Sequence, residues 1–519
     1  MRNLLDQLKH WHKMQPGDVF VIDGKMNLTY DDVLGRALRI AGGIRMLGVE
    51  KGARIACIIF NSYRYYDLFY GLSAGGFVMV PLNYRLAGPE LAYQINDSGA
   101  EVLIVDPEFE EVITKIKDSL RSVKHFVFTG AQCRLEGAIP YERLLEALPY
   151  EVQAQEDALF GIFYTGGTTG LAKGVMLTQR NIIANAFNFV VHLGLRGDHR
   201  ALHAAPMFHL ADGAANFAVT LVGGSHVLVK AFEPVAVFEA IAAFRPTFTV
   251  WVPTMINALV NHPKVGDYDL SSLKLLGYGA SPISPTLLKK AHQVFACDFI
   301  QAYGMTEASP LVTILTPEDH RKALTTPDGE KLLKAAGRQI VGVEARVVDA
   351  NGKDVKPGVV GEIIARGNNI MQGYWNKSEE TATVLIDGWY WSRDLAVVDE
   401  QNYIYIVDRA KDMIISGGEN VYSVEVEDAL SSHPAVMESA VIGVPDEQWG
   451  EAVKGLVVLK PGQTATESEL KDFCREFIAS YKVPRSISFV DALPKSGAGK
   501  ILKRELRKEF WEKREQLVN

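Results

Sequence analysis

The segment YTGGTTGLAKGV, from Tyr164 to Val175, has the residue types that a phosphate-binding loop needs. It carries four glycines, three threonines and one lysine, and it follows the apolar run ALFGIFY. Glycines let backbone N–H groups approach phosphate oxygens closely, hydroxyl groups donate hydrogen bonds, and Lys173 supplies a positive charge. A flexible surface loop is the alternative interpretation, and the density of Thr and Gly argues against it. The segment is not a Walker A loop, because Gly174 follows Lys173 where that motif has Ser or Thr.

Four further residues have side chains suited to chemistry on a bound nucleotide, and each also has a simpler structural interpretation. Glu307, in YGMTE, could hold Mg²⁺ or be a solvated loop acid. Asp394 offers two acceptor oxygens to ribose hydroxyls, or it could shape a turn. Lys500, in the Gly-rich turn PKSGAGK, could swing toward developing negative charge or be a surface lysine. His209 has apolar neighbours on both sides, where a packed core histidine is commoner than a catalytic one.

Taken together, these segments resemble the adenylate-forming superfamily of acyl-CoA synthetases, luciferases and peptide-synthetase adenylation domains. The segment YTGGTTGLAKG resembles the family's phosphate loop, and the resemblance extends over nearly the whole chain. The other matching segments follow in the family's order: GYGASP at 277–282, YGMTE at 303–307, WSRD at 391–394, DRAKDMIISGGEN at 408–420 and PKSGAGK at 494–500.

The resemblance implies a nucleotide-binding role for a large set of positions. Those associated with ATP are Thr165, Gly166, Gly167, Thr168, Thr169, Gly170, Lys173, Gly279, Ala280, Ser281, Tyr303, Gly304, Met305, Thr306, Asp394, Arg409 and Lys500. Tyr303 offers a flat face for adenine stacking. The residues implied to be catalytic are Lys500, Glu307, Thr165 and His209, and Glu307 is also the implied Mg²⁺ ligand.

The resemblance further implies a domain movement between two half-reactions. A residue at the position of Lys411 is the hinge in the family, and the C-terminal domain rotates there. In one orientation Lys500 reaches the phosphates, and in the other a different face helps to form the tunnel for the pantetheine arm of coenzyme A. Gly417 and Gly418 would allow that arm a close approach to the backbone.

Four residues depart from the family pattern. Gly166 stands where the family usually has Ser, Ala172 where it has Pro, and Ser392-Arg393 where it has Thr-Gly before the ribose carboxylate. One phosphate-donating hydroxyl is therefore missing. The remaining threonines and backbone N–H groups can compensate, so we expect retained activity with altered ATP affinity.

The elements that must position these residues are visible as alternating apolar runs and helical patterns. From residue 53, and again from SHVLV at 225–229, short apolar runs alternate with helical segments, as in parallel sheets with crossover helices. After about residue 335, strand-like runs follow one another with Gly and Asn turns. The predicted fold class is α/β: a large N-terminal domain of two layered α/β subdomains plus a small antiparallel β subdomain, hinged to a small α+β C-terminal domain. The predicted domains are 1–410 and 411–519. The resemblance implies that the first binds ATP and the acyl group, and that the second is mobile and carries the catalytic lysine.

Composition narrows the partners and the compartment. The 519 residues carry a formal net charge of -8, which disfavours nucleic acid as a partner. The four cysteines are far apart and form no CxxC pair, so a reducing, cytoplasmic setting is expected. Residues 210–229 are interrupted by Asp212, Gly223, Gly224 and His226, so we expect a buried helix and strand there and no transmembrane segment. We also predict a homodimer.

The resemblance implies an ATP-dependent carboxylic acid–CoA ligase that acts through an acyl-adenylate, releases AMP and pyrophosphate, and uses ATP, Mg²⁺ and coenzyme A. Apolar residues around Phe208, Trp251 and Gly304 favour a fatty or aromatic acid. The alternatives are a stand-alone adenylation enzyme that loads a carrier protein, a catalytically silent nucleotide or acyl sensor, and a luciferase-like oxygenase. Hydrolases are disfavoured, because neither GxSxG nor HExxH occurs in the chain.

Overall fold

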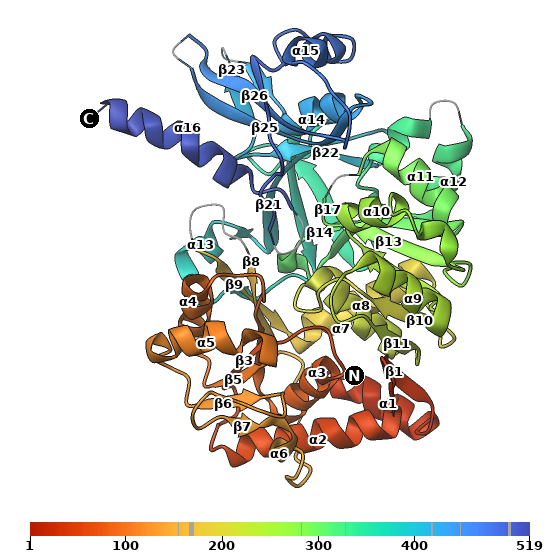
Figure 1. Ribbon diagram of the computed structural model, residues 1–519, viewed down its shortest axis with the longest axis vertical. Helices are drawn as coiled ribbons and strands as arrows, with labels where there is room; N and C mark the ends of the chain where they lie inside the picture. The colour runs from red at the N-terminus through yellow and green to blue at the C-terminus, as the bar shows by residue number, and fades with distance from the viewer. Residues whose placement is uncertain are drawn as a thin grey trace.

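The computed structural model describes residues 1–153, 155–165, 171–281, 283–326, 329–416, 419–446, 448–496 and 500–518. Gly166, Gly167, Thr168, Thr169, Gly170, Gly417 and Gly418, to which the sequence analysis assigns roles, lie outside these residues. Figure 1 shows the chain with its N-terminal helices at the bottom, its C-terminal sheet at the top, and the last helix projecting to one side.

The first large sheet is built mainly from the apolar runs after residue 200, as the alternating pattern predicts. Among the described residues six of its strands run parallel to one another, and antiparallel strands lie at both edges. Within the described residues the order is β16 (Arg338–Gln339), β15 (Leu311–Leu315), β14 (Asp298–Gly304), β13 (Leu275–Gly279), β12 (Phe248–Trp251), β10 (Arg200–His203), β11 (Ser225–Leu228), β1 (Val19–Asp23) and β2 (Met26–Thr29).

The second large sheet uses the apolar runs between residues 54 and 178. Its central strands are parallel, and β8 and β9 close one side as an antiparallel hairpin. Within the described residues the order is β19 (Gly373–Tyr374), β9 (Lys173–Thr178), β8 (Leu159–Thr165), β4 (Val78–Pro81), β3 (Arg54–Ile58), β5 (Val102–Val105), β6 (His125–Phe128) and β7 (Ile139–Pro140).

A shared layer of helices lies between the two sheets, and further helices cover their outer faces. The main apolar core joins residues of both sheets to α2 (Tyr30–Met46), α3 (Arg64–Gly75), α7 (Gln179–Leu193) and α8 (Leu210–Leu221). Local signals set several helix ends, since Thr178 forms a capping box before α7 and Gly76 takes the left-handed conformation after α3. The other helices before residue 400 are α1 (Leu5–Met14), α4 (Gly88–Ser98), α5 (Glu110–Ile116), α6 (Tyr141–Leu144), α9 (Pro234–Phe244), α10 (Pro253–Val260), α11 (Pro285–Phe295), α12 (Pro317–Thr325) and α13 (Ser378–Ala382).

A smaller antiparallel sheet follows the two layered sheets, as predicted from the strand-rich run after residue 335. Its strands are β17 (Val343–Val348), β18 (Gly361–Gly367), β21 (Trp389–Val398) and β20 (Leu385–Ile386), with β22 (Ile404–Arg409) paired to β21. The register of β21 and β22 places Asp394 opposite Arg409, which brings two predicted site residues together.

The last sheet is formed entirely by residues after Asp412. It contains β24 (Glu419–Val421), β23 (Ile414–Ser416), β26 (Gly450–Leu459) and β25 (Val436–Asp446), with β27 (Ser486–Phe489) paired to β26. Helices α14 (Ser423–Ser431) and α15 (Glu467–Arg475) pack on one face, and α16 (Lys503–Val518) packs on the other. Helix α15 ends at Arg475, with Glu476 as its C-cap.

Residues 210–229 form α8 and β11, as the interrupted apolar pattern predicts. Most of their side chains are buried in protein, including the polar Asp212, Asn216 and His226. Among the described residues, no helix is long and apolar enough to span a membrane.

Candidate active site

The phosphate segment joins two paired strands. Thr165 ends β8 and Lys173 begins β9, and the two residues pair across the hairpin. Of the seven residues that connect them, 166–170 lie outside the described part of the chain. Ala172, one of the departures from the family pattern, presents its carbonyl oxygen to the Tyr93 hydroxyl at 3.0 Å. The hairpin therefore directs both ends of the segment toward one place.

Lys173 is held by groups that the sequence analysis did not identify. Its Nζ lies 2.9 Å from Glu380 Oε2, and 5.1 Å from the ring centroid of Tyr374. The Lys173 side chain is 19% exposed and that of Glu380 is 39% exposed. A carboxylate thus occupies the position beside Lys173 that a phosphate group would need.

Glu307 lies in a short 3-10 turn, Thr306–Ala308, directly after β14. Its Oε1 accepts a 2.9 Å hydrogen bond from the Tyr374 hydroxyl. Burial raises the pKa of Glu307, while Tyr374 and the charge of Lys500 oppose that rise.

This carboxylate fits a Mg²⁺ ion that is bound mainly through substrate. Among the described residues, no group of three or more His, Cys, Asp or Glu side chains could enclose a metal. Mg²⁺ commonly keeps several waters and uses one or two carboxylates together with substrate phosphates. Glu307 supplies such a carboxylate, and a nearby cation would favour its ionised form.

Asp394 has hydrogen-bonding partners on both carboxylate oxygens. Tyr303 donates its hydroxyl to Oδ2 at 2.8 Å, and Arg409 donates Nε to Oδ1 at 3.2 Å. Asp394 is only 8% exposed, so these contacts fix its orientation. The bond to Asp394 also fixes the Tyr303 ring that is predicted to stack on adenine.

The structure shows how Arg393 is accommodated where the family usually has glycine. Its backbone has φ +64°, a left-handed conformation that glycine adopts without strain and that costs other residues about 1–2 kcal/mol. Its amide donates to Glu362 Oε1 at 2.8 Å, and its Nη2 donates to Thr383 O at 2.8 Å. These bonds offset the strain and direct the side chain away from the Asp394 carboxylate.

Lys500 lies among charges that come from the earlier sheets. Burial and the neighbouring charge of Arg409 lower the pKa of Lys500 to about 8, against the opposing carboxylates of Asp394 and Glu307. The structure therefore brings together residues that are far apart in sequence, as the family resemblance predicts. A fraction of Lys500 is uncharged at mildly alkaline pH, which a surface lysine would not show.

His209 caps the N-terminus of α8 and lies near Lys500. Its Nδ1 accepts a 3.1 Å hydrogen bond from the Ala211 amide. Burial, with a smaller effect from the Lys500 charge, lowers the pKa of His209 to about 4. The ring is therefore neutral near pH 7 with its proton on Nε2, which leaves that atom able to donate to a carboxylate.

Two glycines bring backbone strands close together beside the site. A Cβ at Gly279 would lie 2.2 Å from Ala302 O, and one at Gly304 would lie 1.7 Å from Pro310 O. Both distances are far inside van der Waals contact, so only glycine fits at either position. Ala280, with φ +67°, and Ser281 follow Gly279 after β13. Met305 and Thr306 follow Gly304 after β14.

Aromatic rings pack around Phe208, the residue before His209. Phe208 meets Tyr84 edge to face at 5.2 Å, and Tyr84 in turn contacts Phe60 at 4.7 Å and Phe109 at 5.8 Å between ring centroids. Trp251 does not join this group, because it is fully buried in the core that α9, α10 and α11 form on the outer face of the first sheet. The aromatic wall near the site therefore comes from Phe208 and Tyr84.

The chain was compared with known proteins. The sequence profile of the AMP-binding enzyme family matches residues 8–375, and that of the AMP-binding enzyme C-terminal domain matches residues 425–500. Feruloyl-CoA synthase of Amycolatopsis sp is 40% identical over 501 residues, covering 96% of this chain and 97% of that protein. The fatty acid–[acyl-carrier-protein] ligase ScoC of Streptomyces coeruleorubidus is 35% identical over 499 residues, covering 95% and 93%. The crystal structure of the anthranilate CoA ligase AuaEII with anthranoyl-AMP superposes with a TM-score of 0.89 at 28% identity, covering 98% and 97%.

The Lys173–Glu380 pair predicts that Glu380 competes with nucleotide phosphates. Glu380→Gln removes a negative charge beside Lys173, so the KM for ATP should fall by about 2- to 5-fold, as expected for a partly exposed ion pair. The maximal rate should stay unchanged. Steady-state assays with varied ATP measure both quantities. Glu379→Gln removes the same charge from the neighbouring residue, and an equal fall in KM there would contradict a specific role for Glu380.

Proposed function

We propose that this chain, which belongs to the AMP-binding enzyme family, joins an aromatic carboxylic acid to coenzyme A through a bound acyl-adenylate. The enzyme is an AMP-forming acid–thiol ligase, an acyl-CoA synthetase that uses ATP, Mg²⁺ and coenzyme A. The observation that carries the assignment of roles is the position of Lys500 among Glu307, Asp394 and Arg409. The residue roles and the class of acid are the parts that we propose.

In the first half-reaction, a carboxylate oxygen attacks the α-phosphorus of ATP, and the bond to pyrophosphate breaks. Lys500 stabilises the negative charge that accumulates on the phosphoryl oxygens in the transition state. Asp394 receives the ribose hydroxyls, and Thr165 and Lys173 lie at the two ends of the phosphate segment. Mg²⁺ at Glu307 would neutralise phosphate charge. Neutral His209 donates Nε2–H to the acid and keeps its attacking carboxylate oriented.

In the second half-reaction, the thiol of coenzyme A attacks the acyl carbon, and AMP leaves. The approach of the thiol requires Lys500 to withdraw, so the sheet that follows Asp412 must turn relative to the earlier sheets. We place the hinge at Lys411, between β22, which ends at Arg409, and β23, which begins at Ile414. This division gives the proposed domains 1–410 and 411–519.

Two observations support an aromatic acid. Phe208, the residue before His209, packs its ring against that of Tyr84, and aromatic rings favour edge-to-face or offset contact with another ring. A similar protein is named as a feruloyl-CoA synthase, and a similar structure contains anthranoyl-AMP. A second candidate acceptor is a carrier protein, because the similar protein ScoC is named as an acyl-carrier-protein ligase.

Location and assembly complete the proposal. We assign the protein to the cytoplasm, which agrees with four free cysteines and with the need for ATP and coenzyme A. The homodimer stays a prediction. It is supported by a partly apolar surface on which Phe187, Val191 and Val341 are 49%, 60% and 64% exposed.

A panel of acids tests the proposed substrate class. Ferulic, cinnamic, benzoic, anthranilic, indoleacetic, octanoic and palmitic acids are each supplied with ATP, Mg²⁺ and coenzyme A. We expect AMP, pyrophosphate and the acyl-CoA, detected by mass spectrometry, with kcat/KM highest for an aromatic acid. Thioester formation with the fatty acids alone would reject the aromatic assignment. Turnover only with a phosphopantetheinylated carrier protein would establish the second candidate.

The role of Lys500 predicts a split between the two half-reactions. Lys500→Ala should lower the rate of adenylate formation by about 10²- to 10³-fold, because it removes charge stabilisation in the transition state. Thioester formation from supplied acyl-adenylate should stay close to normal. Pyrophosphate release and thioester formation are measured separately, and equal losses in both would contradict the role.

The lowered pKa of Lys500 predicts a pH dependence of the first half-reaction. The protonated amine is the active form, so kcat/KM for ATP should fall about tenfold per pH unit above pH 8. Lys500→Arg stays charged, and its profile should remain flat to at least about pH 10. A fall at the same pH in both proteins would assign the titration to another group.

The hinge predicts that backbone freedom at Lys411 matters more than its side chain. Lys411→Pro fixes φ and should slow the thioester step by at least about tenfold relative to the adenylation step. Lys411→Ala keeps both backbone angles free and should show no such difference. Both half-reactions are measured by rapid quench, and normal rates in Lys411→Pro would exclude a hinge at this position.

A further inference from the structure

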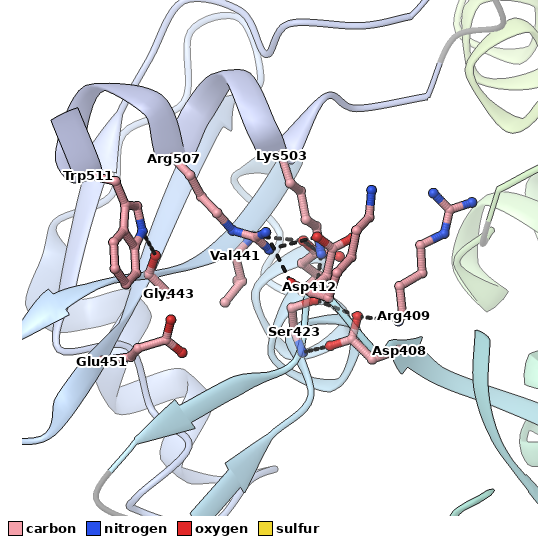
Figure 2. Close-up of polar contacts among 12 residues, drawn as sticks. Asp408, Arg409, Asp412, Ser423, Val441, Gly443, Glu451, Lys503, Arg507 and Trp511 are labelled. Atoms are coloured by element: carbon pink, nitrogen blue, oxygen red, sulfur yellow. Dashed lines mark hydrogen bonds and ion pairs between the residues drawn. The ribbon is translucent and has the colours of Figure 1, made fainter. Parts of the chain in front are cut away.

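Two cationic side chains, one helical turn apart on α16, face two carboxylates that flank the proposed hinge. Lys503 and Arg507 are at i and i+4, so they lie on one side of the helix. Asp408 lies three residues before Lys411, and Asp412 lies one residue after it. Figure 2 shows both cations reaching down from α16 toward the two carboxylates.

Arg507 ties the chain just beyond the hinge to α16. Its Nη2 lies 2.7 Å from Asp412 Oδ1, and its Nη1 donates to Lys411 O at 3.2 Å. A cavity of about 500 Å³ opens beside Lys411, Asp412 and Arg507, so this contact borders solvent-accessible space. Because the Lys411 carbonyl and Asp412 are both held to α16, the chain just after the hinge moves together with α16 and the last sheet.

Lys503 reaches the other side of the hinge through α14. Its Nζ lies 2.7 Å from Glu427 Oε1 and 2.5 Å from Ser423 Oγ. Ser423 in turn donates its amide to Asp408 Oδ2 at 2.5 Å and its hydroxyl to Asp408 Oδ1 at 3.0 Å. This contact, unlike that of Arg507, is closed to solvent, since Asp408 is 1% exposed and Ser423 is fully buried.

The Asp408 end is also continuous with the candidate active site. Asp408 and Arg409 are the last residues of β22, and Arg409 pairs with Asp394 on β21. Burial raises the pKa of Asp408, while Lys503 and the Ser423 hydrogen bonds oppose the rise. The charge of Lys503 therefore helps to keep a carboxylate ionised at the junction between the earlier sheets and α14.

We propose that Asp408, Ser423 and Lys503 form a latch across the hinge, which holds the orientation in which Lys500 lies among Glu307 and Asp394. Ser423 moves with the last sheet, whereas Asp408 stays with β22, so their contact must open when the last sheet turns. Lys503 and Ser423 are positioning residues for adenylation, and Arg507 anchors α16 to the moving side. This inference rests on the proposed function and on the hinge at Lys411.

The first test measures opening of the latch without turnover. Lys503→Met keeps the apolar stem and removes the charge, so the Ser423 amide should exchange its hydrogen at least tenfold faster in peptide-resolved hydrogen–deuterium exchange. Amides in the ladder between β25 and β26 should keep their protection, which shows that the sheet remains folded. Unchanged exchange at Ser423, or an equal loss of protection throughout the last sheet, would overturn the latch.

The second test measures the two half-reactions in the same proteins. Lys503→Met and the milder Ser423→Ala should slow adenylate formation by at least threefold, while thioester formation from supplied acyl-adenylate stays equal or becomes faster. Lys503→Arg should restore the first rate. Lys482→Met is the matched control, because it breaks the 2.7 Å pair with Glu425 on the same helix α14 and does not touch Asp408.

These outcomes separate the latch from the proposed function. Equal slowing of both half-reactions, or the same split in Lys482→Met, would show that Lys503 acts only on folding and would overturn the latch. If the unaltered protein forms no adenylate with any acid, the proposed function fails. The exchange measurement then decides alone whether Lys503 holds Ser423 against Asp408.

Discussion

The arrangement of the site depends on one buried ammonium group, that of Lys500, which lies within a cluster of charges from another part of the chain. Burial lowers the pKa of Lys500 most, Arg409 lowers it further, and the attraction of Asp394 and Glu307 opposes both effects. In the proposed mechanism Lys500 also leaves this cluster, and attraction by two carboxylates without the arginine would oppose that movement. Opposed charges would keep the two proposed orientations close in free energy, as alternation between two half-reactions requires.

Much of this arrangement could be predicted from the sequence, because its local signals agree with its tertiary packing. Thr178 begins α7 with a capping box, and the apolar runs that end at Thr165, Gly279 and Gly304 are strands whose ends meet near the site. Ordered motifs predicted which carboxylates and which lysine would come together, although they lie up to about 200 residues apart. Local pattern and long-range contact point to the same fold here, as expected for a minimally frustrated sequence.

Other features could not be predicted, because they depend on contacts that no short motif encodes. The Tyr374 hydroxyl meets Glu307 across 67 residues of sequence, and Glu380 meets Lys173 only because α13 lies beside the β8–β9 hairpin. The prediction that residues around Trp251 line the acyl site is wrong for Trp251 itself. Successive side chains of β12 point to opposite faces of the sheet, and that of Trp251 points into the outer core. The left-handed backbone of Arg393 could have been predicted from the sequence. Arg393 replaces the glycine that the family usually has before the ribose carboxylate, and glycine at such a position suggests a left-handed conformation.

The close backbone contacts at Gly279 and Gly304 limit how the preference for an acid can change in evolution or in the laboratory. At both positions any side chain would collide with a main-chain carbonyl, which cannot rotate away as a side chain would. Mutant libraries that vary these glycines would therefore consist largely of unfolded proteins. Under the proposed function, Phe208 and Tyr84 are better positions to vary, because their rings meet other rings and not a main-chain carbonyl.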